Sequence, residues 1–462
     1  MAKKRDMNRR DFLRGSAGLA AGILATACAP TATAPAEETA AEEMPEKMEI
    51  ELAFSHWWGD YFGDVTQMIP IFTEKTGIKV QEQPSPFGGY HDKLLTQLVG
   101  GTAPDAFLAD TFFNGTFFPS GLWAPLDEAI NLADLDIEKF AVDPWVETAY
   151  EGTVYALSIF LQEAQLIWIN KEMADETGID LPVWGSDHFD TWHWDDFHNF
   201  ITAGTKRKDD GTIEQYGFGQ VYSGMWWGPH SWIHQNGGEL FDEGIWTYQE
   251  TETLIHEPQF VEMMDNLLGL TVRDKVGPTM AAEEVVEGGT YRSQLAMSRL
   301  GTSAFVDNVL DFEQYVIHLP WTLRKGHGIG ANHNAANASS EYLEEAIQLV
   351  IMMATDWEMQ QQYTNLAGQS PYETVAHIEA APEGPAKDVD LMAISRIEGM
   401  STIPENTEPF AWRCGWYGIE PFVFRDRMAE AMQEVLLGEK TTQEAMDDAK
   451  AEFDAHLAEA RS

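Results

Sequence analysis

The chain has 462 residues, of which 44% are hydrophobic and 23% are charged. This composition is typical of a globular protein, and the length exceeds what one ordinary hydrophobic core holds, so two large lobes are expected. The formal net charge is −46, which repels nucleic acid and anionic membrane surfaces and excludes both as partners. We interpret the charge as an aid to solubility, in a salty medium for example. It does not identify a ligand.

The cysteine and histidine pattern argues against metal or disulfide chemistry. Cys28 and Cys414 are the two cysteines, too few for a disulfide framework or a cysteine-based zinc site. Three histidines recur every five residues, whereas a shared helix face needs a spacing of three or four: His188, His193 and His198. We therefore expect no metal site and no cofactor.

The N-terminal 28 residues form an export address that is separate from the fold. Residues 8–14 resemble a twin-arginine signal, with Arg9-Arg10 followed by Phe12-Leu13. Two cleavage interpretations remain open: ordinary removal after Ala27, or a lipobox in which Cys28 becomes a lipid anchor. We favour the lipoprotein, because residues 29–47 are rich in Ala, Pro, Thr and Glu and form a disordered tether. The protein is thus expected at the cell surface or in the periplasm, attached to the membrane through lipid alone.

Strands and helices are predicted to alternate after the tether. Hydrophobic spacing indicates strands and helices in the order β-α-β-α-β, which is typical of an α/β fold with a parallel sheet covered by helices. The predicted elements are 50–54 (strand), 65–77 (helix), 78–83 (strand), 90–99 (helix) and 106–110 (strand).

Candidate ligand-binding residues follow two of these strands. Trp57 and Trp58 come after the first strand, and Asp110 and Thr111 end the third. Ligands bind beyond the carboxyl ends of the strands in such sheets, so these residues should face one crevice. Packing beneath the loop remains the alternative for either Trp, and a helix cap remains the alternative for Asp110.

Residues 152–171 contain two apolar runs on either side of Gln162-Glu163. This pattern predicts a strand, a short break and a second strand at 166–169. A carboxylate between two buried strands needs a polar partner. We therefore expect the chain to cross between lobes here, with Glu163 facing a ligand in the cleft. A second crossing is expected at 315–320.

The later chain is predicted to contain a hairpin turn, a loop and several helices. A hairpin turn is expected at 208–212, and residues 326–337, which are rich in Gly, Asn and His, are expected to form a loop that contains His327 and His333. Helices are expected at 195–205, 260–268, 342–353, 425–437 and 442–460.

The order of these pieces resembles the extracellular solute-binding proteins of bacterial ABC importers, the group that includes maltose-binding proteins. The resemblance covers about residues 50–457 and depends on dispersed marks in the family's order. These marks are at 72–80, 101–107, 152–157, 166–171, 194–197, 236–238, 296–297, 338–340 and 442–449.

The resemblance implies a two-lobed periplasmic-binding-protein fold, with a ligand cleft between lobes joined by about three crossings, the third near 356–362. It assigns 48–161 and 316–356 to lobe 1, and 162–315 and 357–462 to lobe 2. It also implies a monomer that does no chemistry, binds a sugar or oligosaccharide and delivers it to a membrane permease.

The family also implies roles for particular residues. Glu163 matches a ligand-contacting glutamate of the maltose-binding relatives. Aromatic rings suit the C–H face of a sugar, and charged groups suit its hydroxyls. The further candidates by resemblance are Trp226, Trp227, Arg413, Trp416 and Tyr417. Burial in the core or a structural ion pair remains the alternative for each.

One departure from the family affects the ligand. Relatives often carry a stacking Trp after the Ala-Met strand, where this chain has Leu300-Gly301-Thr302-Ser303. The size or pose of the ligand is therefore expected to differ from maltose.

Two other functions remain open from the residues. A glycosidase would use Glu163 and Asp110 as a carboxylate pair, although no spacing places them at a working separation. The same fold could instead bind a cationic solute in a cage of acids and Trp rings.

Overall fold

A computed structural model describes the chain in segments, and the structural statements below concern these residues: 50–57, 67–86, 88–110, 114–136, 139, 148–163, 166–183, 185–189, 191–219, 229–242, 250–279, 281–282, 289–301, 311–320, 322–323, 327–363, 372–380, 411–412 and 421–460.

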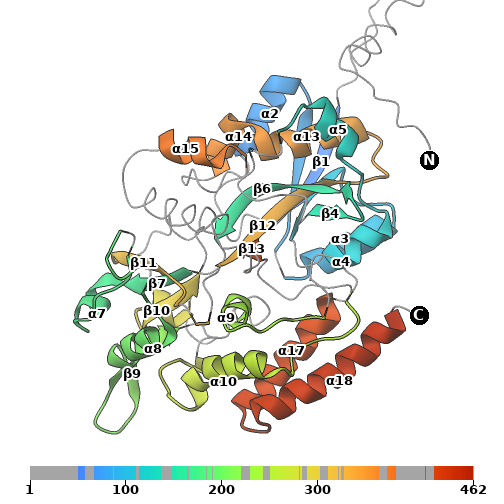
Figure 1. Cartoon of the computed structure of the whole chain (residues 1–462). Helices are drawn as coiled ribbons and strands as arrows, with labels where there is room; N and C mark the ends of the chain where they lie inside the picture. The colour runs from blue at the N-terminus through green and yellow to red at the C-terminus, as the bar shows by residue number, and fades with distance from the viewer. Residues whose placement is uncertain are drawn as a thin grey trace, which may run out of the picture.

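The chain folds into two lobes, each built on its own sheet (Figure 1). Lobe 1, at the top of Figure 1, has the strand order β2-β1-β3-β12-β6, and β13 pairs with the first residues of β12. β1 runs parallel to β2 and β3, whereas β12 is antiparallel to β3 and β6. The bounds are β1 Glu51–His56, β2 Lys79–Pro84, β3 Ala106–Asp110, β6 Ala156–Glu163, β12 His327–Ala336 and β13 Ala411–Trp412.

Lobe 2 has the strand order β11-β7-β10-β9-β8. β9 and β10 are parallel to each other, and the remaining pairs are antiparallel. The bounds are β7 Leu166–Asn170, β8 Lys206–Arg207, β9 Ile213–Gly219, β10 Ala296–Gly301 and β11 Gln314–His318. The predicted turn at 208–212 joins β8 to β9, closed by the Lys208 N–H donating to the Thr212 carbonyl at 2.9 Å.

Helices cover both sheets. Lobe 1 holds α2 Met68–Thr76, α3 Tyr90–Val99, α4 Asn114–Phe117, η4 Phe118–Ser120, α5 Asp127–Leu132, the hairpin β4 Ala149–Tyr150 and β5 Thr153–Val154, α13 Leu343–Thr355, α14 Trp357–Tyr363 and α15 Thr374–Ala380. Lobe 2 holds α7 Lys171–Asp175, α8 Trp194–Ala203, α9 His230–Gln235, α10 Pro258–Val272, α12 Gly289–Arg292, α17 Pro421–Leu436 and α18 Thr442–Ala460.

The helices form where apolar residues recur on one face. In α2 the buried residues are Met68, Ile69 and Phe72, the spacing of a helix that packs one side on a core. Gly77 ends this helix in the left-handed conformation, with φ of +78° and its N–H donated to the Thr73 carbonyl. All five residues of β3 are buried, as expected for a central strand covered on both faces.

Residues 327–336 form a central strand, so the prediction of a loop there was wrong. β12 lies between β3 and β6, and Asn332, His333 and Asn334 are each at most 3% exposed. Gly and Asn have low strand propensity, but burial between two partner strands outweighs that preference. His333, expected in a flexible loop, instead packs in the core, with its ring 5.8 Å from that of Trp123.

The chain passes between the sheets near the positions predicted from sequence. β6 ends at Glu163 in lobe 1 and β7 begins at Leu166 in lobe 2. The second passage lies between β11 and β12, because Ile317 and Leu319 belong to the core of lobe 2. Residues 316–319, assigned to lobe 1 from sequence, therefore lie with lobe 2.

The third passage lies later than the predicted 356–362. Met359 of α14 is in the core of lobe 1, and β13 pairs with β12 of the same lobe. Phe424 of α17 is in the core of lobe 2, so the chain returns to lobe 2 between Trp412 and Phe424. The described residues 357–363 therefore belong to lobe 1.

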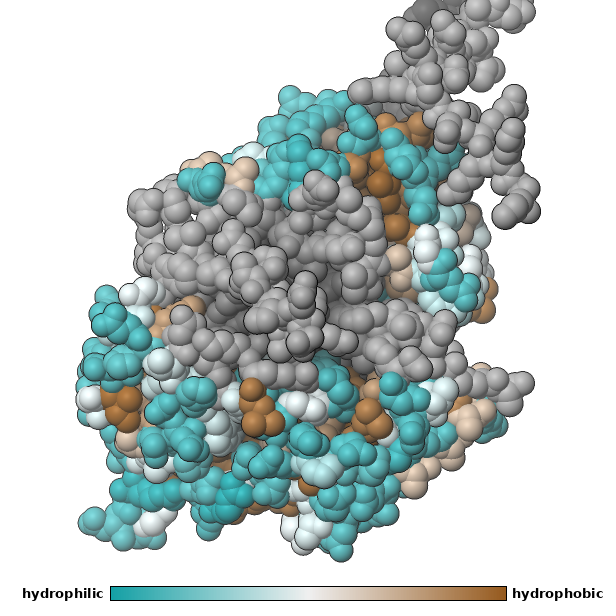
Figure 2. All heavy atoms as spheres, viewed as in Figure 1, coloured by the Kyte–Doolittle hydropathy of each residue, from teal (hydrophilic) through white to brown (hydrophobic). Residues whose placement is uncertain are grey.

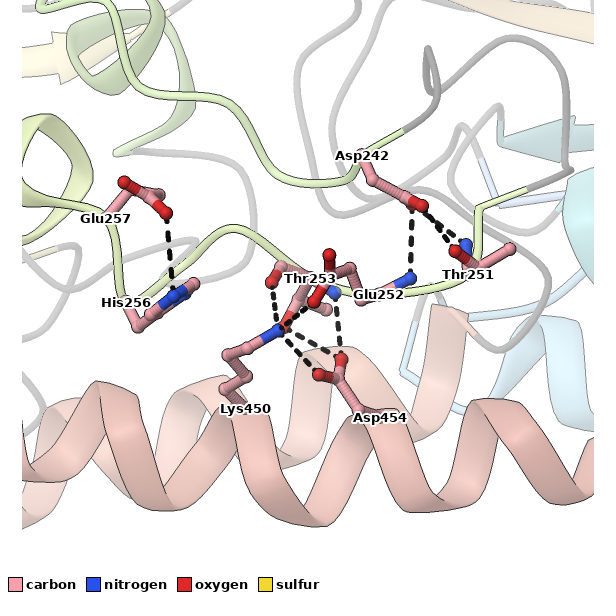
Figure 3. A network of polar contacts seen from close by, with 8 residues as sticks. All are labelled: Asp242, Thr251, Glu252, Thr253, His256, Glu257, Lys450 and Asp454. Carbon is pink, nitrogen blue, oxygen red and sulfur yellow. Dashed lines mark hydrogen bonds and ion pairs between the residues drawn. The ribbon is translucent and has the colours of Figure 1, made fainter.

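The two last helices complete lobe 2. α17 and α18 bury an apolar stripe that includes Met428, Met446 and Phe453. Figure 3 shows how α18 also binds the segment 251–257: Lys450 Nζ donates to the Thr253 carbonyl at 2.7 Å, and Asp454 accepts the Thr253 N–H at 2.8 Å. On the face seen in Figure 2, the surface of this lobe is mostly hydrophilic.

Candidate functional site

The carboxyl ends of several lobe 1 strands meet at one edge of the sheet. β1 and β3 are parallel, so His56 and Asp110 end at the same side. Asn332 of β12 lies opposite both Asp110 and Phe160. β6 then continues three residues beyond that level to Glu163. The sheet therefore places the backbone of Glu163 at the same edge as Asp110. That either side chain contacts a ligand stays a prediction.

Trp57 lies beneath this edge. Its side chain is 2% exposed, and its ring lies 4.9 Å from that of Tyr90 and 5.1 Å from that of His91. This buried position agrees with the second of the two roles expected for Trp57, packing beneath the loop. Contact of Trp57 with a ligand stays a prediction.

Tyr90 and His91 hold the strand ends in place, a role that sequence reasoning missed. The Tyr90 hydroxyl lies 3.0 Å from the Ser55 carbonyl oxygen and 2.9 Å from the Leu108 carbonyl oxygen, and its one hydrogen is shared between these two acceptors. It therefore links β1 to β3. Burial raises the pKa of Tyr90 above its usual value. The hydroxyl thus stays protonated and able to donate.

His91 fixes Asp110. The Asp110 backbone N–H donates to His91 Nε2 at 3.1 Å, which requires an unprotonated Nε2. Burial lowers the pKa of His91 well below its usual value, and the nearby charges of His333 and Arg425 add to the effect. Arg425 belongs to α17 of lobe 2.

α9 lies where lobe 2 meets β12 of lobe 1. Its polar residues are buried: His230 Nε2 lies 2.8 Å from His234 Nε2, and His234 Nδ1 lies 3.2 Å from Glu239 Oε2. The Leu323 N–H, in the second passage between lobes, donates to the Gln235 carbonyl at 3.1 Å. Sequence reasoning singled out none of these residues. The spacing of two histidines by four residues was the available signal.

The turn after α9 contains Asn236-Gly237-Gly238, one of the segments that carry the family resemblance. Asn236 Nδ2 donates to the Gln259 carbonyl at 2.9 Å, and Gly237 has a φ of +81°. A Cβ on Gly238 would lie 2.7 Å from Ile233 Cγ2 and 3.1 Å from Phe260 Cα. The sequence Asn-Gly-Gly therefore permits α9 to pack closely against α10.

The other predicted site residues fall outside what the structure describes, or are described only in part. The backbone of Glu163 is described, and its side chain is not. Outside the described residues lie Trp58, Thr111, Trp226, Trp227, Arg413, Trp416, Tyr417 and the anchor Cys28. Trp58, Thr111, Trp227 and Arg413 lie within two residues of described positions, which are Trp57, Asp110, Pro229 and Trp412.

Within the described residues no group of three or more His, Cys, Asp or Glu side chains is arranged to hold a metal ion. In the same part of the chain, no helix has both the length and the apolar character that a membrane span requires.

A family model decides the identity of the fold. Residues 59–359 match the bacterial extracellular solute-binding proteins, and residues 6–26 match the twin-arginine translocation signal. The chain belongs to the bacterial extracellular solute-binding proteins. The predicted two-lobed α/β fold and the predicted export signal are thereby confirmed. No curated protein matches the chain.

Solved structures of solute-binding proteins share this fold. The ABC substrate-binding protein Lmo0181 from Listeria monocytogenes, in complex with cycloalternan, is 19% identical with a TM-score of 0.74, over 89% of this chain and 99% of that one. The GacH receptor of Streptomyces glaucescens, solved unliganded and with acarbose, is 17% identical with a TM-score of 0.68, over 89% and 99%. Maltose-bound T. maritima MalE3 is 18% identical with a TM-score of 0.67, over 87% and 98%.

Proposed function

We propose that this solute-binding protein is the substrate-binding component of an ABC transporter, which captures a sugar or oligosaccharide outside the cell and delivers it to a membrane permease. The observation that carries the proposal is that β3 and β6 end, at Asp110 and Glu163, on the same edge of the lobe 1 sheet, where the chain passes to lobe 2. Carboxylates suit sugar hydroxyls because they accept charge-assisted hydrogen bonds, and in this proposal both line the ligand cleft between the lobes. Bound cycloalternan, acarbose and maltose in proteins of the same fold support this choice of ligand.

The mechanism needs no bond to break. Two lobes joined by three passages can close around a ligand by hinge motion, with the ligand selecting the closed state. In this proposal the sugar contacts are Trp57, Trp58, Asp110, Thr111, Glu163, Trp226, Trp227, Arg413, Trp416 and Tyr417. The protein works as a monomer, without a cofactor, and is attached to the membrane through lipid on Cys28.

A thermal-shift screen of the exported chain tests the proposal. Maltose, maltotriose, mannotriose and cycloalternan form one arm, and cationic amines form the other. A sugar that binds only the folded state raises the midpoint. Glu163→Gln should weaken binding of that sugar at least tenfold, while Glu373→Gln, which changes a partly exposed residue paired with Lys139, should not. A shift with amines alone would favour the cationic-solute alternative and overturn the sugar assignment.

A further inference from the structure

β6 contains one extra residue on its way to the passage between lobes. Ser158 lies opposite His333 and Phe160 lies opposite Asn332, so Ile159 has no position opposite it in β12. This is a β-bulge, which leaves the inserted residue outside the regular ladder. Ile159 is 1% exposed, so bulk water cannot satisfy its backbone carbonyl.

The side chain of Gln360 satisfies that carbonyl. Gln360 is fully buried, and its Nε2 donates to the Ile159 carbonyl at 2.8 Å and to the Met353 carbonyl at the end of α13. Its Oε1 is buried and accepts no hydrogen bond in the described part of the chain. The amide of Gln360 thus serves as a donor of two hydrogen bonds, and among the described residues its oxygen contributes none.

Gln360 is itself held firmly in lobe 1. Its backbone N–H donates to the Asp356 carbonyl at 2.9 Å, and Asp356 Oδ1 accepts the Met359 N–H at 3.2 Å. Asp356 is paired with Lys75 of α2 at 2.7 Å, and Met359 is in the lobe 1 core. The amide thus reaches β6 from a fixed helix.

The bulge sets the register of the last residues of β6. Glu163 now lies opposite Ile329, and Gln162 lies opposite Gly330. If Ile159 entered the ladder, every later residue would move by one place, and Gln162 would lie opposite Ile329. Successive strand residues point to opposite faces, so such a slip exchanges the faces of Gln162 and Glu163.

We propose that Gln360 is a positioning residue for the ligand site: by holding the bulge at Ile159, it keeps Glu163 in the register that presents it to the solute. Gln360 acts through β6 and not by contact with the ligand. The effect on affinity rests on the proposed role of Glu163, whereas the effect on register does not.

A double-mutant cycle tests the link to Glu163. Gln360→Met keeps the volume and removes both donors. For the best sugar of the panel, maltotriose for example, we expect at least a tenfold loss of affinity by calorimetry in the exported chain. In the Glu163→Gln background the same change should cause no further loss. Gln215→Met is the matched control, because Gln215 Nε2 also donates to a buried backbone carbonyl, that of Gly204 at 2.7 Å in lobe 2. It should lower stability and leave affinity unchanged.

Amide hydrogen exchange measures, without any ligand, how firmly the end of β6 is held in its ladder. The N–H groups of residues 157–163 should exchange at least tenfold faster in Gln360→Met and at the wild-type rate in Gln215→Met. If Gln360→Met exchanged at wild-type rates, the role of Gln360 would be overturned, whether or not any sugar binds. If no sugar bound the wild-type protein, only the proposed function would be overturned. A loss of affinity that adds fully to that of Glu163→Gln would overturn it as well. Where Gln360→Met does not fold, Gln360→Asn, which shortens the amide by one carbon, carries the same comparison.

Discussion

At the scale of single residues, the strand-end edge of lobe 1 depends on a neutral histidine. His91 accepts the Asp110 N–H, and its pKa lies well below the usual value because the ring is buried. In the unfolded chain a histidine binds a proton near pH 6.5. As the pH falls below that value, the unfolded state binds more protons than the folded state, so stability decreases.

We therefore expect His91→Gln to reduce the acid sensitivity of the fold. The Gln side-chain oxygen can accept the same N–H but does not titrate. Between about pH 6.5 and 5, the slope of the free energy of unfolding against pH should fall by up to about 1.4 kcal/mol per pH unit. Urea denaturation at four pH values measures the slope. The control His188→Gln changes an exposed histidine and should keep the wild-type slope. Equal slopes in all three proteins would contradict the role of His91.

The residues of the candidate site were only partly predictable from sequence. Asp110 and Glu163 are the last residues of β3 and β6, and an apolar pattern shows about where a strand ends. Tyr90 and His91 are at the start of α3, and the apolar spacing of Leu94, Leu95 and Leu98 already accounts for this helix. The local pattern therefore offered no reason to single them out. Their partners are backbone groups of other strands, which no local pattern reveals. For the same reason, a bulge at Ile159 and its partner Gln360 could be found only in three dimensions.

At the scale of elements, boundaries were predicted best where strong local signals agree. The helices at 90–99 and 442–460 and the strand at 106–110 have the predicted bounds or nearly so. Apolar spacing marks all three, and glycines flank both ends of 90–99. β12 was missed because its composition favours a loop, while its burial depends on two strands that are distant in sequence. The third passage was misplaced because α14 has no composition that distinguishes one lobe from the other.

The backbones of α8 and β9 approach each other closely at Gly217. A Cβ on Gly217 would lie 1.8 Å from the backbone oxygen of Ile201. Gly217→Ala must push α8 away from the sheet and should cost about 3 kcal/mol or more. Gly88→Ala, where a Cβ meets open space, should change stability by less than about 0.5 kcal/mol. Thermal or urea unfolding measures both, and a Gly217→Ala protein as stable as the control would refute the close approach.

At the scale of the whole molecule, charge opposes compactness. Residues 1–28 carry six basic and two acidic residues, so the chain without them has a net charge of −50 instead of −46. Self-repulsion of this kind destabilises the folded state. Salt screens it, since the Debye length falls from about 10 Å at 0.1 M to about 3 Å at 1 M.

The unfolding midpoint should accordingly rise by several degrees between 0.05 and 1 M NaCl, and KCl should act equally because screening depends on ionic strength. Differential scanning calorimetry of the exported chain measures the shift. A midpoint that is flat or falls with salt would contradict the interpretation of the charge. A rise confined to one cation would indicate a bound ion instead.

Three passages between two separate cores make the lobes able to move as units. The cores share no apolar cluster among the described residues, so closing the cleft need not disturb the packing of either lobe. In the proposed function, the polar and aromatic groups near the strand ends capture the ligand, and Gln360 acts on one of them, Glu163, through β6.

Isothermal titration calorimetry of the exported chain with the oligosaccharide panel tests this account most directly. We expect one sugar to bind with 1:1 stoichiometry and a dissociation constant of micromolar or lower, about −8 kcal/mol or more favourable, and to be recovered chemically intact. Silence with every sugar, or recovery of a cleaved product whose formation stops in Glu163→Gln, would contradict it.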